Sequence, residues 1–288
     1  MKPDPISVKG EGGATVREAL ADAERRLTAV PGVPRLDAEI LMAAALGVPI
    51  GEMMLSHLDA TAPEEFEALI RRRLTQEPMG YVVGRVGFWT IELDVGPGAL
   101  IPRADSESLI EAAVAHFQGR APANILDLGT GPGTLLLAAL DQWPQARGLG
   151  VDASEAALGY ARANAERLGM APRAEWRRGD WAESIDERFD LILVNPPYVE
   201  DATALIPGVV DWEPGLALFG GVDGLDHYHT LAPQLARLLA PGGVACVEIG
   251  ARQEKALIPL FEAQGFTIES RKDLRGIVRC LILTLDRH

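Results

Sequence analysis

Four consecutive residues, Asn195, Pro196, Pro197 and Tyr198, have the types and spacing needed to hold a planar NH2 group. Such a nitrogen is a poor nucleophile because its lone pair is delocalised. The Asn195 side-chain oxygen and the Pro196 carbonyl can each accept one N–H and favour the charge that develops there. The prolines make the segment stiff and extended, and Tyr198 offers a flat face. The segment predicts alkylation of an amide-type nitrogen, with Asn195, Pro196 and Tyr198 as catalytic residues and all four binding the acceptor.

Histidines and carboxylates near this segment do not form a pattern for general-base or nucleophilic catalysis. This chemistry needs no strong base, since the nitrogen becomes very acidic once alkylated and its proton can pass to water. No Ser-His-Asp or paired-carboxylate arrangement accompanies the segment. We expect His227 and His229, near a helix start, to be solvated or capping residues.

A glycine-rich segment, Gly129, Thr130, Gly131, Pro132 and Gly133, follows an apolar run and opens a helical one. Its glycines allow a tight turn and close backbone approach to a ligand, and the helix beyond supplies free N–H groups. The third glycine of a dinucleotide fingerprint would come one residue later. The tighter G-x-G-x-G spacing therefore predicts an adenosyl ligand that lacks a pyrophosphate.

Two further positions match such a ligand. Asp152 ends the next strand-like run, where a carboxylate can accept hydrogen bonds from both ribose hydroxyls. Asp152 could instead cap the following helix, but Ser154 is also available for that role. Asp180 and Trp181 follow the third run, and they could frame an adenine ring by hydrogen bonding and stacking.

Strand-like and helical runs alternate from residue 124 onward. The strand-like runs are 125–128, 148–151, 175–177, 191–194, 244–249, 267–271 and 280–285. The helical runs are 134–142, 155–168, 225–239 and 254–264. Alternation of this kind predicts an α/β fold with a mainly parallel, doubly wound sheet. Ligands bind such sheets at the carboxyl ends of the strands, so the site is expected beyond the first and fourth strands.

The amino-terminal part is expected to be helical. Thr15 and Glu18 fit a capping box, and helices are expected at 35–46, 51–56 and 63–75. The charged run 71–73 is interpreted as a solvated face. Two strand-like runs, 81–86 and 88–95, then predict a hairpin that links this part to the rest.

Composition limits the class of partner and the compartment. The 288 residues carry a formal net charge of -14, which disfavours direct nucleic-acid binding. The two cysteines, Cys246 and Cys280, are too few for a disulfide scaffold or a metal cluster, so we expect buried structural thiols and no metal. No signal peptide or membrane-spanning run is visible, so a cytoplasmic protein without membrane contact is expected.

Taken with the glycine segment, Asp152 and residues 195–198, further motifs carry a resemblance to a known family. They are 76–78, Tyr81, Gly84, 88–89, 101–103, 213–214, 217–218 and 241–243. The chain resembles the HemK/PrmC-type release-factor glutamine methyltransferases over about 15–285. The resemblance implies a class I (Rossmann-like) methyltransferase fold with a helical substrate-recognition domain (1–78), a linking β-hairpin (79–100) and a catalytic domain (101–288).

The same resemblance implies that S-adenosylmethionine is the cofactor and that the methyl group goes to N5 of the glutamine in the Gly-Gly-Gln motif of peptide chain release factors. It implies cofactor contacts for Gly129 to Gly133, Asp152, Trp181 and Asn195. The family commonly shows Pro-Arg-Pro-Glu-Thr-Glu where this chain has Pro-Arg-Ala-Asp-Ser-Glu over residues 102–107. Arg103 and Glu107 persist and are expected in the cofactor pocket, while Ala104 in place of proline loosens the backbone.

Other acceptors use the same chemistry. A glutamine of a ribosomal protein, or N6 of adenine or N4 of cytosine in DNA, would also fit residues 195–198. The negative charge and the absence of a separate basic recognition region argue against DNA. A binding module that keeps the fold without turnover is a third hypothesis, because fold alone does not prove activity.

Overall fold

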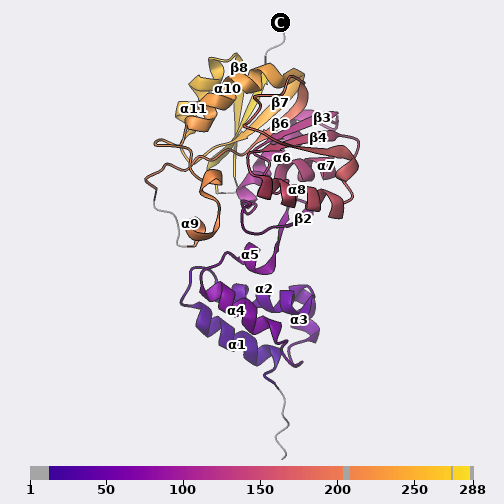
Figure 1. The fold of residues 1–288 in the computed structure, drawn as a ribbon, viewed down its shortest axis with the longest axis vertical. Coiled ribbons are helices and arrows are strands. Elements are labelled where there is room, and N and C mark those ends of the chain that lie inside the picture. Colours follow the sequence, from indigo (N-terminus) through magenta and orange to yellow (C-terminus); the bar gives the residue numbers. More distant parts are fainter. Residues whose placement is uncertain (1–12, 204–207, 274, 286–288) are drawn as a thin grey trace, which may run out of the picture. The chain divides into compact units, whose positions relative to one another are not determined.

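The computed structural model describes residues 13–203, 208–273 and 275–285 (Figure 1). Its contacts divide the chain into two compact units, Met1–Val83 and Gly84–His288. The expected hairpin strand over 81–86 is wrong in its first half, because Met79–Val83 form a short helix, α5. The hairpin consists of β1 (Arg85–Phe88) paired antiparallel with β2 (Ile91–Asp94).

The first unit is helical, as expected. Its longer helices are α1 (Val16–Leu27), α2 (Pro34–Leu46), α3 (Ile50–Ser56) and α4 (Glu65–Leu74). Thr15 and Glu18 form the capping box at the start of α1. The apolar faces of these helices share one core, which includes Leu20, Leu41 and Ile70.

The arginine run at the end of α4 is solvated at Arg71 and Arg72, as expected from the sequence, but not at Arg73. Arg73 is only 8% exposed, and it donates to Asp37 at 3.0 Å and to the Pro31 carbonyl. Arg72 donates to the buried Glu77 at 2.9 Å. Both arginines therefore connect α4 to neighbouring segments of the first unit, and the buried Arg73 in particular needs its paired carboxylate.

The second unit contains a seven-stranded sheet in the order β5-β4-β3-β6-β7-β9-β8. The strands are β3 (Asn124–Leu128), β4 (Arg147–Asp152), β5 (Ala174–Arg178), β6 (Phe189–Val194), β7 (Leu239–Glu248), β8 (Phe266–Lys272) and β9 (Val278–Leu285). Only β9 runs antiparallel to its neighbours, and the other pairs are parallel. The order reverses direction at β3, next to β6, which is the topological switch point where ligands bind such sheets.

The helices of this unit connect the strands. They are α6 (Glu107–Phe117), α7 (Thr134–Gln142), α8 (Glu155–Arg167), α9 (Val209–Trp212), α10 (Asp226–Leu238) and α11 (Glu254–Glu262). Short 3-10 turns occur at Ala104–Ser106, Ala171–Arg173 and Gly215–Ala217. Helix α6 is not among the expected helices, because the alternation that predicts them begins only at residue 124.

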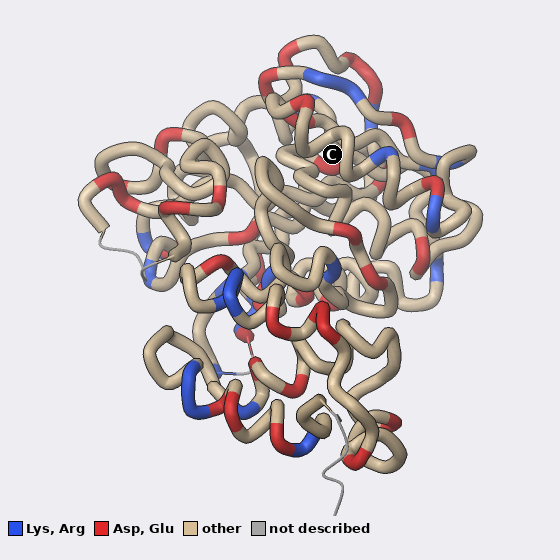
Figure 2. The backbone as a smooth tube through the Cα atoms, turned by 60° about the horizontal axis from the view of Figure 1, so that its bottom comes forward, with Lys and Arg blue, Asp and Glu red and all other residues tan. Residues whose placement is uncertain are grey.

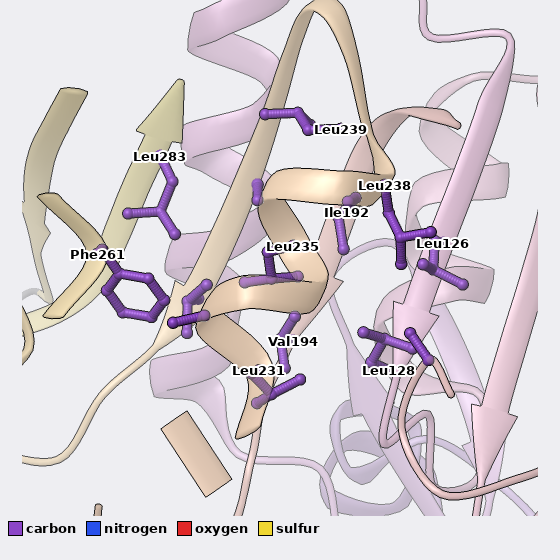
Figure 3. Packing of buried hydrophobic residues seen from close by; sticks show 14 of the residues in the cluster. Leu126, Leu128, Ile192, Val194, Leu231, Leu235, Leu238, Leu239, Phe261 and Leu283 are labelled. Atoms are coloured by element: carbon purple, nitrogen blue, oxygen red, sulfur yellow. The ribbon is translucent and has the colours of Figure 1, made fainter. Parts of the chain in front are cut away.

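Alternate strand residues face opposite sides of the sheet. Leu126, Ile192 and Val194 pack against α10, in a core that also contains Phe261 of α11 (Figure 3). The intervening residues face the other side, where a Cβ added at Gly148 would lie 2.2 Å from Leu136 of α7. Burial on both faces explains why these strands are continuous apolar runs rather than alternating ones.

The structure also shows where the charged residues and the two cysteines lie. Aspartate and glutamate are scattered over both units with lysine and arginine interspersed (Figure 2). Both cysteines are free and buried, as predicted. Among the described residues, no single helix is long and apolar enough to cross a membrane, although α2 and α3, bent by 85° at their junction, reach that length and composition together.

Candidate active site

A cavity of about 920 Å³ opens at the carboxyl ends of β3, β4 and β6, within the second unit. Its volume lies at the upper end of the range for small-molecule sites. Ten of the residues expected in the site line it: Arg103, Gly129, Thr130, Gly131, Pro132, Asp152, Asp180, Trp181, Asn195 and Pro197. Four others are outside the lining: Glu107, Gly133, Pro196 and Tyr198.

The glycine loop between β3 and α7 is held rigidly. Gly129 and Gly131 have φ of 73° and 57°, a left-handed conformation that L-residues rarely adopt. The Gly129 and Thr130 amides donate to the Val151 carbonyl, at 2.9 and 3.0 Å. A Cβ added at Gly131 would meet no atom within 4 Å, so the backbone there faces open space that a ligand can approach.

Asp152 joins the end of β4 to this loop. One carboxylate oxygen accepts the Gly131 N–H at 2.8 Å, and the other accepts the Ser154 N–H at 2.8 Å. Burial raises the pKa of Asp152, while these amides act in the opposite direction. Ser154 caps α8 by accepting the Ala157 N–H at 3.2 Å, so the carboxylate is not required as the helix cap. Each oxygen keeps a second lone pair for a ligand.

Asp127 is a site residue that the sequence analysis missed. It is 1% exposed and lines the cavity, and its Oδ2 accepts the Thr130 hydroxyl at 2.6 Å and the Leu136 N–H at 3.1 Å. Its Oδ1 is buried without a hydrogen-bond partner among the described residues. Burial raises the pKa of Asp127 to about 7, and the nearby Asp152 adds to the rise. A charged residue inside a buried apolar strand, two residues before a glycine loop, was the available signal.

Trp181 and Asp180 both line the cavity beyond β5. Trp181 adopts φ of 48°, and a Cβ added at Gly129 would lie 3.3 Å from its ring. The ring of His227, which also lines the cavity, lies 5.3 Å from that of Trp181 at an interplanar angle of 59°. His227 is therefore a half-buried residue of the cavity wall, while His229 is exposed, as expected from the sequence.

Residues 195–198 leave β6 beside the glycine loop, where Gly129 lies close to the Asn195 main-chain oxygen. Asn195 and Pro197 line the cavity. The Asn195 Nδ2 donates to Ser106 Oγ at 3.2 Å, which leaves its Oδ1 available to accept. The Tyr198 hydroxyl donates to Glu248 Oε1 at 3.2 Å, so this side chain is directed at a buried carboxylate. The expected contact of Tyr198 with an acceptor stays a prediction.

Glu248, at the end of β7, is a second residue that the sequence analysis missed. It is 1% exposed, and its Oε2 has no hydrogen-bond partner among the described residues. Burial raises the pKa of Glu248 to about 7, although the hydroxyls of Ser106 and Tyr198 act to lower it. A single glutamate inside the apolar run 244–249 was the sequence signal for a special role.

The segment that precedes α6 contributes one cavity residue. The Arg103 guanidinium lines the cavity and donates to the buried Glu213 and to the Ile101 carbonyl. Glu107 does not enter the cavity, because its carboxylate accepts the Trp89 N–H at 2.8 Å. That bond ties the hairpin turn to α6, so Glu107 has a structural role here.

Comparison with known proteins identifies the family. The PrmC N-terminal domain matches residues 18–84, and the Methyltransferase small domain matches residues 105–209. A release factor glutamine methyltransferase from Rhodospirillum rubrum is 43% identical over 282 residues, covering 95% of this chain and 86% of that protein. One from Caulobacter vibrioides is 41% identical, covering 84% and 86%. The chain belongs to the release factor glutamine methyltransferase family.

The fold of the chain is similar to that of a solved methyltransferase. The 16S rRNA methyltransferase RsmC of T. Thermophilus, in complex with AdoMet and guanosine, is 20% identical and covers 70% of this chain and 50% of that one, with a TM-score of 0.50. This likeness confirms the class I fold. Among the described residues, no group of three or more histidine, cysteine or acidic side chains is placed to hold a metal ion.

Proposed function

We propose that this enzyme transfers a methyl group from S-adenosylmethionine to the side-chain amide nitrogen of glutamine in the Gly-Gly-Gln motif of peptide chain release factors. The observation that carries the proposal is that Asn195 and the glycine loop line one cavity. An acceptor amide held by Asn195 therefore lies beside a cofactor held by the loop.

The cavity has polar groups that match S-adenosylmethionine. The unpartnered Oδ1 of Asp127 suits a cationic ammonium group, because a buried carboxylate gains most from a charged donor. Arg103, held by Glu213, suits the carboxylate of the cofactor. Asp152 retains lone pairs for the ribose hydroxyls, and Trp181 offers a ring face for the adenine. The residues present thus fit each part of this cofactor.

The acceptor site suits a primary amide. Asn195 Oδ1 would accept one N–H from the cavity, and the carbonyl of Pro196, whose residue is not part of the cavity lining, would accept the other; together they would orient the nitrogen and stabilise the positive charge that develops on it. Pro197 lies on the cavity wall and keeps the segment extended. Positioning of this kind can supply several kcal/mol, up to about 7–11 for ideal geometry.

When bound, the cofactor supplies an electrophilic methyl group on a positively charged sulfur. Held by the glycine loop, Asp152 and Arg103, it would supply that methyl group to the amide nitrogen and would be left as a neutral thioether. Asn195 and Pro196 hold the two N–H groups through this step. The alkylated nitrogen then loses one proton to water, so the enzyme needs no dedicated base.

Release factors are favoured over the other acceptors by family membership and by charge. The relatives are named for release factor glutamine methylation across most of this chain. The net charge of -14 disfavours DNA, and no observation favours a ribosomal-protein glutamine. We place the reaction in the cytoplasm, where release factors act.

The test is to incubate the purified enzyme with methyl-labelled S-adenosylmethionine and a release factor, and to locate the label by mass spectrometry. The expected result is one methyl group on the glutamine of the tripeptide. The matched control is a factor in which that glutamine is replaced by alanine. Equal labelling of the control factor, or labelling of duplex DNA without any protein acceptor, would contradict the proposal.

A further inference from the structure

The hydroxyl of Ser106 is placed for a task other than helix capping. Ser106 is the N-cap residue of α6, where a serine normally accepts an N–H of the first turn. Its side chain makes no such bond and instead accepts from Asn195 Nδ2 at 3.2 Å. Ser106 is 2% exposed, so the contact is shielded from water.

Glu248 lies directly beside this pair. Val194 of β6 is in register with Val247 of β7, so Asn195, directly after β6, lies beside Glu248, the last residue of β7. The Tyr198 hydroxyl donates to the Glu248 carboxylate at 3.2 Å, and the Ser106 hydroxyl lies close enough to act to lower the pKa of Glu248. A hydroxyl that gives its proton to a carboxylate has only lone pairs to offer elsewhere.

The segment that carries Ser106 is held from the other side by an ion-pair network. Asp105 pairs with Arg275 at 2.7 Å and with Arg279 at 3.2 Å. Arg279 is mostly buried and also pairs with Asp273 at 3.4 Å. These contacts compensate for the conformational freedom that Ala104 gives the segment, so the position of the Ser106 hydroxyl is well determined.

We propose that Ser106 and Glu248 are positioning residues that fix the orientation of the Asn195 side-chain amide. Glu248 takes the Ser106 proton, Ser106 Oγ therefore accepts from Asn195 Nδ2, and Asn195 Oδ1 is left for the acceptor amide. With the opposite orientation, Nδ2 would face the acceptor and repel its N–H groups. This inference rests on the proposed function for its kinetic consequences but not for the orientation itself.

Two substitutions disturb the orientation in different ways. Ser106→Ala removes the group that holds Nδ2. Glu248→Gln keeps the shape of the side chain but replaces a carboxylate oxygen with an NH2 group, which cannot accept the Ser106 hydroxyl. The hydroxyl can then donate to Asn195 Oδ1 and take the place of the acceptor amide. We expect each to lower kcat about 10- to 100-fold, because misplacement of a catalytic group has costs of this order. KM for the release factor and the dissociation constant for S-adenosylmethionine should stay within about twofold.

The control variants separate positioning from general stability. Ser106→Thr keeps the hydroxyl and should restore most of the turnover. Ser108→Ala removes another buried hydroxyl of the same helix start, one that donates to the Asp105 carbonyl at 2.7 Å, and should leave kcat unchanged. If Ser106 acts through Asn195, then adding Ser106→Ala to Asn195→Ala should cause no further loss. Multiplied losses in the double variant would overturn the inference.

The closing experiment reads the orientation without any acceptor. In nitrogen-15 NMR spectra of the full chain with S-adenosylmethionine, the Asn195 NH2 signals are assigned by their loss in Asn195→Asp. We expect one of these protons to be protected from solvent exchange in the wild type, and this protection to be lost in both Ser106→Ala and Glu248→Gln. Unchanged protection in either variant refutes the inference, whereas a wild-type enzyme that labels no release factor refutes only the proposed function.

Discussion

The buried side chain of Asp127 should destabilise the fold when it is charged, and the same charge should favour binding of the cofactor. Burial raises its pKa from 3.8 to about 7 in the structure without ligand. The change to test is Asp127→Asn, whose side-chain oxygen can still accept from Thr130 and Leu136. We expect this variant to be more stable than the wild type at pH 8 and to bind S-adenosylmethionine more weakly.

The size of the stability effect follows from the difference in pKa. A difference of about three in pKa corresponds to about 4 kcal/mol, which is an upper bound for the gain. Because the pKa of Asp127 is higher in the folded than in the unfolded state, its stabilising contribution is complete below pH 4. That contribution is lost as pH rises through 7. The gain from Asp127→Asn should therefore be about 2–3 kcal/mol larger at pH 8 than at pH 5.

The cost to cofactor binding has a separate origin. A hydrogen bond to a charged group contributes about 1.5–3 kcal/mol, so loss of the Asp127 carboxylate should weaken S-adenosylmethionine binding about 10- to 100-fold. In the wild type, binding a cation should release a proton below pH 7, since Asp127 is then protonated in the free enzyme. Affinity should accordingly fall as pH decreases from 7 to 6.

Urea unfolding at pH 5, 6, 7 and 8 without cofactor measures the first effect, and isothermal titration measures the second. Asp186→Asn, at a fully exposed carboxylate, is the control and should change neither quantity. A stability gain that is the same at pH 5 and pH 8 would refute the assigned role of burial. Unchanged cofactor affinity would show that Asp127 does not contact the ligand.

Three other predictions concern the acceptor site, the loop and the first unit. Asn195→Ala should lower turnover about 100-fold or more with little change in cofactor affinity, as kinetics and titration will show; equal losses in both would contradict its role. Gly131→Ala should weaken cofactor binding, because the added Cβ enters the cavity. The control is Gly119→Ala, because Gly119 also has a positive φ (84°) but does not line the cavity. It should only destabilise the fold by about 1–3 kcal/mol of backbone strain, measured by thermal unfolding. Arg73→Met should cost about 3–5 kcal/mol in urea unfolding by leaving a buried carboxylate unpaired, whereas the exposed Arg71→Met should cost almost nothing.

The order of elements in the catalytic unit could be predicted because its strands are buried on both faces. Continuous apolar runs such as 191–194 and 244–249 are then distinct from the amphipathic helices between them, and the structure contains strands at each expected run. Local signals were less decisive where contacts compete. Residues 81–83 have β-branched and aromatic character, yet they form α5 and contribute Tyr81 and Val82 to buried packing.

Some residues of the site could also be placed from the sequence, and others could not. Residues 129–132, Asp152 and Asn195 could be placed in advance, because parallel strands bring their carboxyl ends to one edge of the sheet. Tyr198 and Glu107 could not, because the direction of a side chain depends on partners far away in sequence. The Tyr198 hydroxyl donates a hydrogen bond to Glu248, 50 residues later in the sequence. The Glu107 carboxylate accepts one from the amide of Trp89, 18 residues earlier.

The sequence alone determined the class of fold, the family motifs and the groups proposed to bind a cofactor and a planar amide, because each depends on local spacing or strand order. Tertiary structure alone decided which carboxylates are buried and which hydroxyl contacts the Asn195 amide. Asp127, Glu248 and Ser106 have common polar side chains whose function comes from desolvation and from neighbours on other strands. The loss of solvent around these groups and their contacts with distant residues exist only once the chain has folded.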